Sequence, residues 1–267
     1  MSGIVVENLQ YTYPHAKQPT LKGVSFTAET GELTALIGAN AVGKSTMLKV
    51  ILGLRQGQGT VTFSVPEIGD LNKEARLKHI SYMTQSELTE SELRVMDVVL
   101  LGRIQTLSLK VADEDLEKAW ETMRVLRIDN LATRPVRALS GGQRRMVSIA
   151  QTLVKDPTIL VMDEPTANLD MQHELEVLQL VRAYTHQRKT ASLLTLHDLN
   201  MASRFADKLV LLKDGKVFAT GTPGEVITEE NIRNAYGVEV SIHLAHDGIP
   251  ILNPLRSLTE QNYHFAL

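Results

Sequence analysis

The amino-acid sequence predicts an α/β protein whose core is a mostly parallel β-sheet. Short, almost wholly apolar runs recur at residues 33–37, 158–162 and 191–196, and such runs form strands that are buried on both faces. Segments with apolar residues at helical spacing lie between them, which is the order of strand, helix and strand that builds parallel sheets. The chain has 267 residues, which is long enough to bury such a core.

Composition narrows the class of protein before any motif is considered. Apolar residues make up 43% of the chain and charged residues 22%, as in soluble globular proteins. The net charge of −3 gives no reason to expect a nucleic-acid partner, and the lack of cysteine excludes disulfides and thiolate chemistry. No apolar run reaches membrane-spanning length, and the N-terminus lacks a signal-peptide pattern, so we expect any membrane role to act through a partner.

The N-terminal part is expected to contribute strands. Apolar or alternating runs predict short strands at residues 4–9, 24–28, 60–65 and 80–85. The turn after the first strand carries two aromatic residues, Tyr11 and Tyr13. The last of these strands ends in Gln85, whose amide can reach a metal ion or a water molecule.

A glycine-rich loop follows the apolar run 33–37 and precedes a helical pattern. The residues of the loop and of the helix start are Gly38, Ala39, Asn40, Ala41, Val42, Gly43, Lys44, Ser45 and Thr46. In this context they form a phosphate-binding loop, because its N–H groups and the positive end of the helix face the phosphates of a nucleotide. Lys44 can reach the β- and γ-phosphates, and the Ser45 hydroxyl can bind Mg²⁺. Tyr13 or Tyr11 can stack on the base, and the sequence does not separate the two.

The chain turns helical from about residue 86 to residue 155. One helix is predicted to start with Asp113, Glu114 and Asp115, a solvated acidic turn that suits the helix dipole. A second amphipathic helix follows the segment Leu139-Ser140-Gly141-Gly142-Gln143. Ser140 and the glycines would present free N–H groups there, which makes a second anion-binding helix end. An N-cap followed by a glycine turn explains the same segment equally well.

Polar residues that follow two of the buried strands are candidates for catalysis. Asp163 and Glu164 end the run 158–162, where ligands of α/β proteins bind. Asp163 can hold Mg²⁺ and Glu164 can polarise an attacking water, whereas a helix cap would explain only one of the two carboxylates. His197 follows the run 191–196 and can donate to a γ-phosphate, although a lone histidine is more often structural.

The ordered set of motifs resembles the nucleotide-binding domain of ABC transporters. In that family's terms the motifs are the Walker A loop 38–46, the Q-loop Gln85, the signature 139–143, Walker B 159–163 with Glu164, the D-loop 167–170 and the switch histidine His197. The resemblance covers nearly the whole chain. It implies a P-loop ATPase with a RecA-like parallel-sheet core, an N-terminal antiparallel β subdomain and an inserted helical subdomain.

The domain limits that follow from this resemblance are a single ATPase domain over residues 1–240 and a tail over residues 221–267 with short helices. Within the domain, the core and β part comprise residues 1–85 and 156–220, and the helical part comprises residues 86–155.

The resemblance also implies that two copies stack head to tail and enclose each ATP. One copy supplies the loop of Lys44 and the other supplies Ser140, Gly141 and Gly142. The implied catalytic residues are Glu164, His197 and Gln85, and the implied Mg²⁺ ligands are Ser45, Gln85 and Asp163. The implied ATP-binding residues are Tyr13, all residues of the loop 38–46, Ser140, Gly141, Gly142, Gln143 and Asp170.

A finer similarity is to the ATPases of importers for ferric siderophores, haem and cobalamin. Residues 98–103, 196–200, 210–216 and 221–238 carry it. It implies a subunit at the cytoplasmic face of the cell membrane that powers uptake of an iron-siderophore or related metal chelate through an integral permease. The segment after Gln85 would contact that permease, and a substrate-binding protein would act indirectly. The alternative is a soluble ABC ATPase without a permease, such as a scaffold in metal-cluster assembly. A regulatory GTPase is disfavoured, because Asn72-Lys73 lacks the following Asp of guanine readers.

Two positions depart from the family pattern. Ala41 stands where the family usually has glycine, and a positive φ there would cost about 1 kcal/mol. The signature helix begins Arg144-Arg145-Met146, where a third basic residue is more usual, so contacts with a partner are affected rather than the ATP site.

Overall fold

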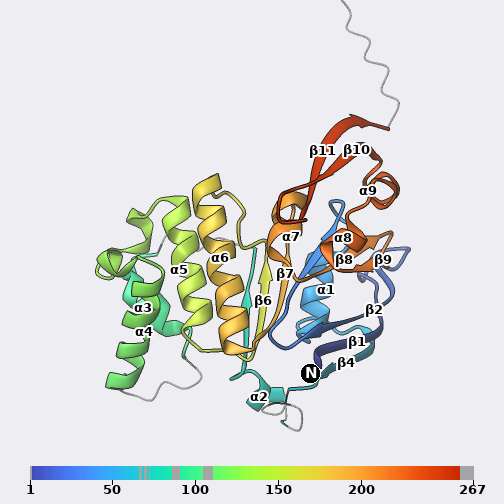
Figure 1. The fold of residues 1–267 in the computed structure, drawn as a ribbon. Helices are drawn as coiled ribbons and strands as arrows, with labels where there is room; N and C mark the ends of the chain where they lie inside the picture. Colours follow the sequence, from blue (N-terminus) through green and yellow to red (C-terminus); the bar gives the residue numbers. More distant parts are fainter. Residues whose placement is uncertain are drawn as a thin grey trace, which may run out of the picture. The chain divides into compact units, whose positions relative to one another are not determined.

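Figure 1 shows the fold in a computed structural model, which describes residues 2–65, 68, 71, 73–85, 91–104 and 111–258. The chain forms two compact units, and each combines segments that are far apart in the sequence. The first unit contains Met1–Val5, Thr27–Leu33 and Val61–Leu196, and the second contains Val6–Phe26, Thr34–Thr60 and His197–Leu267. The boundaries of these units differ from the domain limits expected from the sequence. Those limits stay a prediction.

Three parallel strands form the sheet of the first unit. They are β5 (Ile80–Met83), β6 (Ile159–Asp163) and β7 (Ala191–Thr195), with β6 in the middle. Every residue of β6 and β7 is buried, as expected for apolar runs in a parallel sheet. The register places Asp163 beside Thr195, so the polar ends of two neighbouring strands lie at one edge of the sheet.

The helical part of the first unit is built from α3 (Val95–Leu101), α4 (Asp113–Val125) and α5 (Gly141–Leu153), which pack on one another (Figure 1). Helix α6 (Met171–Arg188) connects β6 to β7, and α2 (Lys73–Arg76) is a single turn. Short 3₁₀ turns span Asp129–Leu131 and Val136–Ala138.

The predicted solvated first turn of α4 is wrong at one position. Asp113 and Glu114 are exposed, but Asp115 is buried and forms an ion pair with Arg103. Consecutive residues of a helix point about 100° apart, so three acids in a row span about 200° of its surface, and here the third lies on the packed side. The partner of Asp115 lies outside the helix, where helical periodicity gives no signal.

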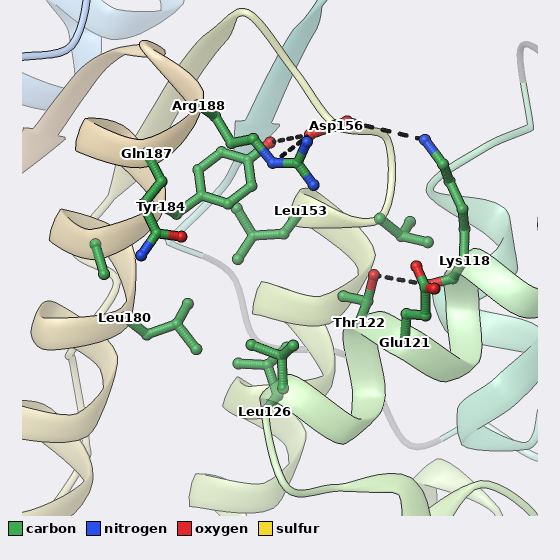
Figure 2. A pocket seen from close by; sticks show the side chains of 13 residues that line it. Lys118, Glu121, Thr122, Leu126, Leu153, Asp156, Leu180, Tyr184, Gln187 and Arg188 are labelled. Atoms are coloured by element: carbon green, nitrogen blue, oxygen red, sulfur yellow. Dashed lines mark hydrogen bonds and ion pairs between the residues drawn. The ribbon is translucent and has the colours of Figure 1, made fainter.

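A cavity of about 430 Å³ lies between α4, α6 and the residues that follow α5 (Figure 2). Leu126, Leu153 and Leu180 contribute to its apolar wall. At its rim, Asp156 accepts a hydrogen bond from the Tyr184 hydroxyl at 2.9 Å. Its carboxylate is also 3.8 Å from the amine of Lys118 on α4 and 3.6 Å from Nε of Arg188 on α6. One loop carboxylate therefore ties the two helices together. Burial, followed by the charge of Asp156, raises the pKa of Tyr184.

The sheet of the second unit contains β3 (Leu33–Gly38), β8 (Lys208–Lys213) and β9 (Lys216–Gly221). Strands β3 and β8 are parallel, and β8 and β9 form an antiparallel hairpin. Its turn residues, Asp214 and Gly215, have φ of 50° and 78°, as is typical of an Asp-Gly hairpin turn. The helices of this unit are α1 (Lys44–Ile51), α7 (Leu199–Phe205), α8 (Pro223–Val226) and α9 (Glu229–Tyr236).

A three-stranded sheet of β1 (Ser2–Tyr11), β2 (Leu21–Glu29) and β4 (Gln58–Phe63) has β1 in its middle. Each of these three strands has some residues in the first unit and the others in the second unit. The predicted N-terminal strands are therefore present. Strands β1 and β2 are longer than predicted, β4 begins and ends two residues earlier, and β5 ends at Met83 instead of residue 85.

The tail contains a β-hairpin that the sequence analysis did not predict. Helices α8 and α9 are followed by β10 (Val238–Leu244) and β11 (Pro250–Ser257), which pair antiparallel. The Asp247-Gly248 pair between them is a hairpin signal that would have found it. Residues 259–267 of the predicted tail, 86–90 of the predicted permease contact and Asn72 lie outside the described residues. No described helix is long and apolar enough to span a membrane.

Candidate functional site

The phosphate loop, residues 38–46, joins β3 to α1 within the second unit. Gly38 and Gly43 have φ of 147° and 110°, which side chains rarely adopt. A Cβ on Gly38 would also lie 2.6 Å from the carbonyl oxygen of Leu212. Ala41 shares the left-handed backbone, with φ 61°, so the loop holds an alanine where the backbone favours glycine.

Lys44 begins α1 and is bonded to the loop that precedes it. Only 6% of its surface is exposed, and its Nζ donates to the carbonyl oxygens of Gly38 at 2.7 Å and Ala39 at 3.2 Å. Gly43 occupies the N-cap of α1 without a side-chain cap. A helix N-terminus that starts from a glycine loop, with a buried lysine beside it, is a ready site for phosphate.

The structure distinguishes the two tyrosines that the sequence left open. Their rings meet edge to face, with centroids 5.0 Å apart. Tyr11 is buried and its hydroxyl accepts a hydrogen bond from Arg55 at 3.0 Å. Tyr13 keeps part of its surface exposed, and its hydroxyl lies 2.8 Å from Oγ1 of Thr46 at the end of the phosphate loop. Tyr13 is therefore the better placed to stack on a base beside the loop.

The two carboxylates at the end of β6 are held by neighbours within the first unit. Thr195 at the end of β7 is fully buried, and its hydroxyl donates to Oδ1 of Asp163 at 2.7 Å. The same hydroxyl accepts the backbone N–H of Glu164 at 2.7 Å. Glu164 has a φ of 51°, and one of its carboxylate oxygens accepts a hydrogen bond from the Gln85 amide at 2.8 Å. The structure therefore brings Gln85, Asp163 and Glu164 together at one edge of the sheet.

Arg145 on α5 holds the same segment from the other side. It is 4% exposed, and its Nε donates to the carbonyl oxygen of Pro165 at 2.8 Å. Its Nη2 reaches the carbonyl oxygens of Asp163, at 3.4 Å, and of Glu164. The guanidinium thus connects the helix that follows the signature to the backbone that carries the catalytic candidate Glu164.

The signature residues Ser140–Gln143 form the N-terminus of α5. Ser140 Oγ accepts the N–H of Gln143 at 3.2 Å, and the Gln143 side chain accepts the N–H of Ser140 at 3.1 Å, which closes a capping box. A Cβ on Gly141 would meet nothing within 4 Å, and one on Gly142 would make only an ordinary contact of 3.6 Å with Leu169. Neither glycine has a positive φ, so this chain's own fold does not require glycine there.

Two further sequence candidates lie at helix starts. Asp170 caps α6, where its carboxylate accepts the N–H of His173 at 3.0 Å. This backbone bond lowers the pKa of Asp170, and the bond to the His173 ring adds to the effect. His197 is exposed and precedes Asp198, which caps α7 through the N–H groups of Asn200 and Met201. His197 belongs to the second unit, with the phosphate loop.

The chemistry of the predicted Mg²⁺ ligands suits the ion. Ser45, Gln85 and Asp163 offer a hydroxyl, an amide and a carboxylate, all oxygen donors, and Asp163 is already oriented by Thr195. No group of three or more acidic or histidine side chains that could hold a metal occurs in the described part of the chain.

Sequence reasoning missed Thr195 and Arg145. Thr195 lies within an apolar run that reads as core, and its role depends on the register between β6 and β7. Arg145 appeared only as part of the segment in which the signature helix departs from the family pattern. The one available signal was an arginine on the apolar side of an amphipathic helix, where a buried charge requires partners.

Comparisons with known proteins agree with this geometry. The sequence profile of the ABC transporter family matches residues 21–167. An ABC transporter ATP-binding protein of Methanocaldococcus jannaschii is 36% identical over 94% of this chain and 97% of its own length. A hemin import ATP-binding protein of Gloeobacter violaceus is 34% identical over 89% of each chain.

Solved structures give the same result. A metal-chelate type ABC transporter in an inward-facing conformation matches with a TM-score of 0.83 at 25% identity, covering 96% of this chain and 98% of the other. A dimeric ABC transporter cassette bound to ADP and phosphate matches with a TM-score of 0.72 at 27% identity, covering 82% and 98%. These matches confirm the predicted P-loop ATPase fold. The chain therefore belongs to the ABC transporter family, as an ATP-binding and ATP-hydrolysing member.

Proposed function

We propose that this chain powers import of an iron-siderophore or related metal chelate, as the ATPase subunit of a transporter. In this proposal two copies pair head to tail, each ATP lies between the phosphate loop of one copy and the signature residues of the other, and the pair drives an integral permease from the cytoplasmic face of the membrane. The relatives that import hemin and the metal-chelate type transporter support the substrate class.

One observation carries the pairing: α5 begins with two glycines that its own fold does not need. Glycine within a helix costs about 1 kcal/mol relative to alanine, and around Gly141 there is open space for a side chain. Such a cost is expected where another molecule must approach the backbone closely. The helix start offers N–H groups and a positive dipole end, so that molecule is expected to be anionic. The phosphates of an ATP held by a second copy meet that requirement.

The proposed roles come from the family resemblance, and contacts within each unit support several of them. Lys44 and the N–H groups of its loop hold the β- and γ-phosphates, and Tyr13 stacks on adenine. Glu164 accepts a proton from the attacking water, and Gln85 holds its carboxylate in place through the 2.8 Å hydrogen bond. His197 donates to the γ-phosphate.

Ser45, Gln85 and Asp163 would hold Mg²⁺, and Gln143 and Asp170 contribute to the signature side of the sandwich. When bound, the ion supplies positive charge that offsets the charge developing on the phosphates.

The catalytic assignment is tested by Glu164→Gln. This variant is expected to lose ATP turnover at least a hundredfold while it still binds ATP, and sedimentation with ATP should show it as a dimer. Hydrolysis at the wild-type rate would contradict the role of Glu164.

The pairing is tested by placing a negative charge at the open helix start. Gly141→Asp puts a carboxylate where the helix dipole favours it, so the monomer should fold at least as stably as the wild type. The same charge repels the phosphates of the partner's ATP, so dimerisation with ATP should be lost in the Glu164→Gln background. Gly224→Asp is the matched control, because Gly224 lies near the start of α8 with equally open surroundings. A dimer that forms with Gly141→Asp as readily as with the control would refute the sandwich.

The permease is tested by purification from membranes in detergent. A polytopic partner that stays bound supports the importer. A purely soluble complex supports the alternative, a scaffold in metal-cluster assembly.

A further inference from the structure

We propose that Thr195 is a positioning residue for hydrolysis, which sets the side chain of Asp163 and the backbone of Glu164 through one hydroxyl. The inference rests on the proposed function, because it concerns the same ATP site. Thr195 does not contact the reacting atoms. It acts through the two residues that do.

The Thr195 hydroxyl makes two hydrogen bonds, each with a donor–acceptor distance of 2.7 Å. It donates its proton to Oδ1 of Asp163 and accepts the backbone N–H of Glu164. Thr195 is 0% exposed and Asp163 is 1% exposed, so water does not compete for the bond between these two side chains. A hydroxyl can donate one proton and accept others, so a single side chain can satisfy a carboxylate and an N–H at the same time.

The position of Thr195 is set by the sheet rather than by a flexible loop. Thr195 is the last residue of β7, and its Cα is paired with that of Asp163 in the parallel register. A β-branched side chain on a strand has few χ1 choices, so the hydroxyl is held in one orientation. The N–H of Glu164 is thereby anchored to the neighbouring strand.

The anchor matters because Glu164 has a backbone that a glutamate rarely adopts. Its φ of 51° lies in the left-handed region, which costs a non-glycine residue energy and persists only where the surroundings impose it. Thr195 holds the N–H of Glu164, and Arg145 holds its carbonyl oxygen. Together these bonds fix both sides of the strained residue and so aim its carboxylate.

The two functions of the hydroxyl lead to a specific expectation. Loss of the hydroxyl should release both carboxylates from their orientation, so the chemical step slows and the metal site weakens. The affinity for ATP should change little, because Lys44, its loop and Tyr13 form a separate part of the site in the second unit. A general loss of packing would not separate these effects.

The test uses three variants of the full chain. Thr195→Val keeps the shape and removes the hydroxyl, and Thr195→Ser restores the hydroxyl. Thr185→Val is the matched control, since Thr185 is also 0% exposed in the first unit and its hydroxyl also makes two hydrogen bonds, with Val181 and Ser192. Thermal melts establish that each variant is folded.

We expect Thr195→Val to lower kcat at least tenfold, in keeping with loss of a buried bond to a charged group, while the Kd for a fluorescent ATP analogue changes less than about twofold. Thr195→Ser should recover most of kcat, and Thr185→Val should retain it. In the Glu164→Gln background with ATP, paramagnetic resonance titration should show Mn²⁺ bound several times more weakly by Thr195→Val.

Each contrary result has a distinct meaning. Unchanged kcat and Mn²⁺ affinity in Thr195→Val, an equal loss in Thr185→Val, or no recovery in Thr195→Ser would each overturn the role of Thr195. A wild-type chain without ATP hydrolysis would instead contradict the proposed function, and the Mn²⁺ titration would still decide whether Thr195 orients Asp163.

Discussion

Replacing Ala41 by glycine should stabilise the protein. Ala41 has a φ of 61° in the phosphate loop, and its side chain is exposed, so the substitution removes strain without removing packing. In this region Cβ lies too close to the carbonyl oxygen that follows it, which costs a non-glycine residue about 1–2 kcal/mol. Glycine has no such penalty.

The expected size follows from two opposing terms. Relief of the left-handed strain contributes about 1–2 kcal/mol, and the greater freedom of glycine in the unfolded chain takes back about 0.4–1 kcal/mol. The net gain is about 0.5–1 kcal/mol, which corresponds to a rise in Tm of roughly 1–2 °C for a chain of this size. The affinity for ATP should not fall, because the same loop N–H groups remain.

Urea denaturation measures the change, with Ala183→Gly as the control. Ala183 is also exposed but lies inside α6, where glycine should cost about 1 kcal/mol. The two substitutions are chemically identical, so opposite shifts of the urea midpoint isolate the backbone effect. If Ala41→Gly lowers the midpoint as much as Ala183→Gly does, positive φ at residue 41 is not a source of strain and the reasoning fails.

Three further changes test other parts of the structure. Arg145→Met should cost about 3–5 kcal/mol in urea unfolding, because it removes a buried cation from three backbone carbonyls, whereas Arg144→Met on the same helix should cost far less. Tyr82→Phe should leave stability unchanged or raise it, because the Tyr82 hydroxyl has no hydrogen-bond partner among the described residues. Burial, followed by the charge of Asp163, raises the pKa of Tyr82 from 10.0 to about 12. The unfolded chain therefore loses this proton at lower pH than the folded chain, and the wild type should lose stability between pH 10 and pH 12. Thermal melts of Tyr82→Phe should lack that part of the loss. Tyr13→Ala should weaken ATP binding by about 1–3 kcal/mol but leave the affinity for inorganic tripolyphosphate unchanged. Calorimetry measures both affinities, and an equal loss for the two ligands would contradict stacking of Tyr13 on the base.

The sequence predicted those site residues whose role depends on their neighbours in the chain. It did not predict those whose role depends on which strands pair. The phosphate loop was predictable because strand, glycines, lysine and helix are contiguous. Asp163 and Glu164 were predictable from their place after an apolar run. Thr195 was not, because its role depends on which strands pair and in which register.

Burial also decided questions that residue type left open. Tyr11 and Tyr13 are equivalent in the sequence, and only packing shows that Tyr11 is buried while Tyr13 stays partly exposed. Asp115 read as part of a solvated charge run because its partner, Arg103, comes from a segment outside the helix. In both cases the deciding contact is tertiary, and a local pattern does not contain it.

The bonds of Lys44 to its own loop bear on how quickly nucleotides exchange. Its ammonium is already satisfied by the carbonyl oxygens of Gly38 and Ala39, so an arriving phosphate replaces existing hydrogen bonds instead of meeting a bare buried charge. The net gain from Lys44 is then smaller than that of a new ion pair, and the departing product leaves behind a loop with its shape and charge intact. In an ATPase that must release ADP at each cycle, these bonds limit how tightly the spent nucleotide is held.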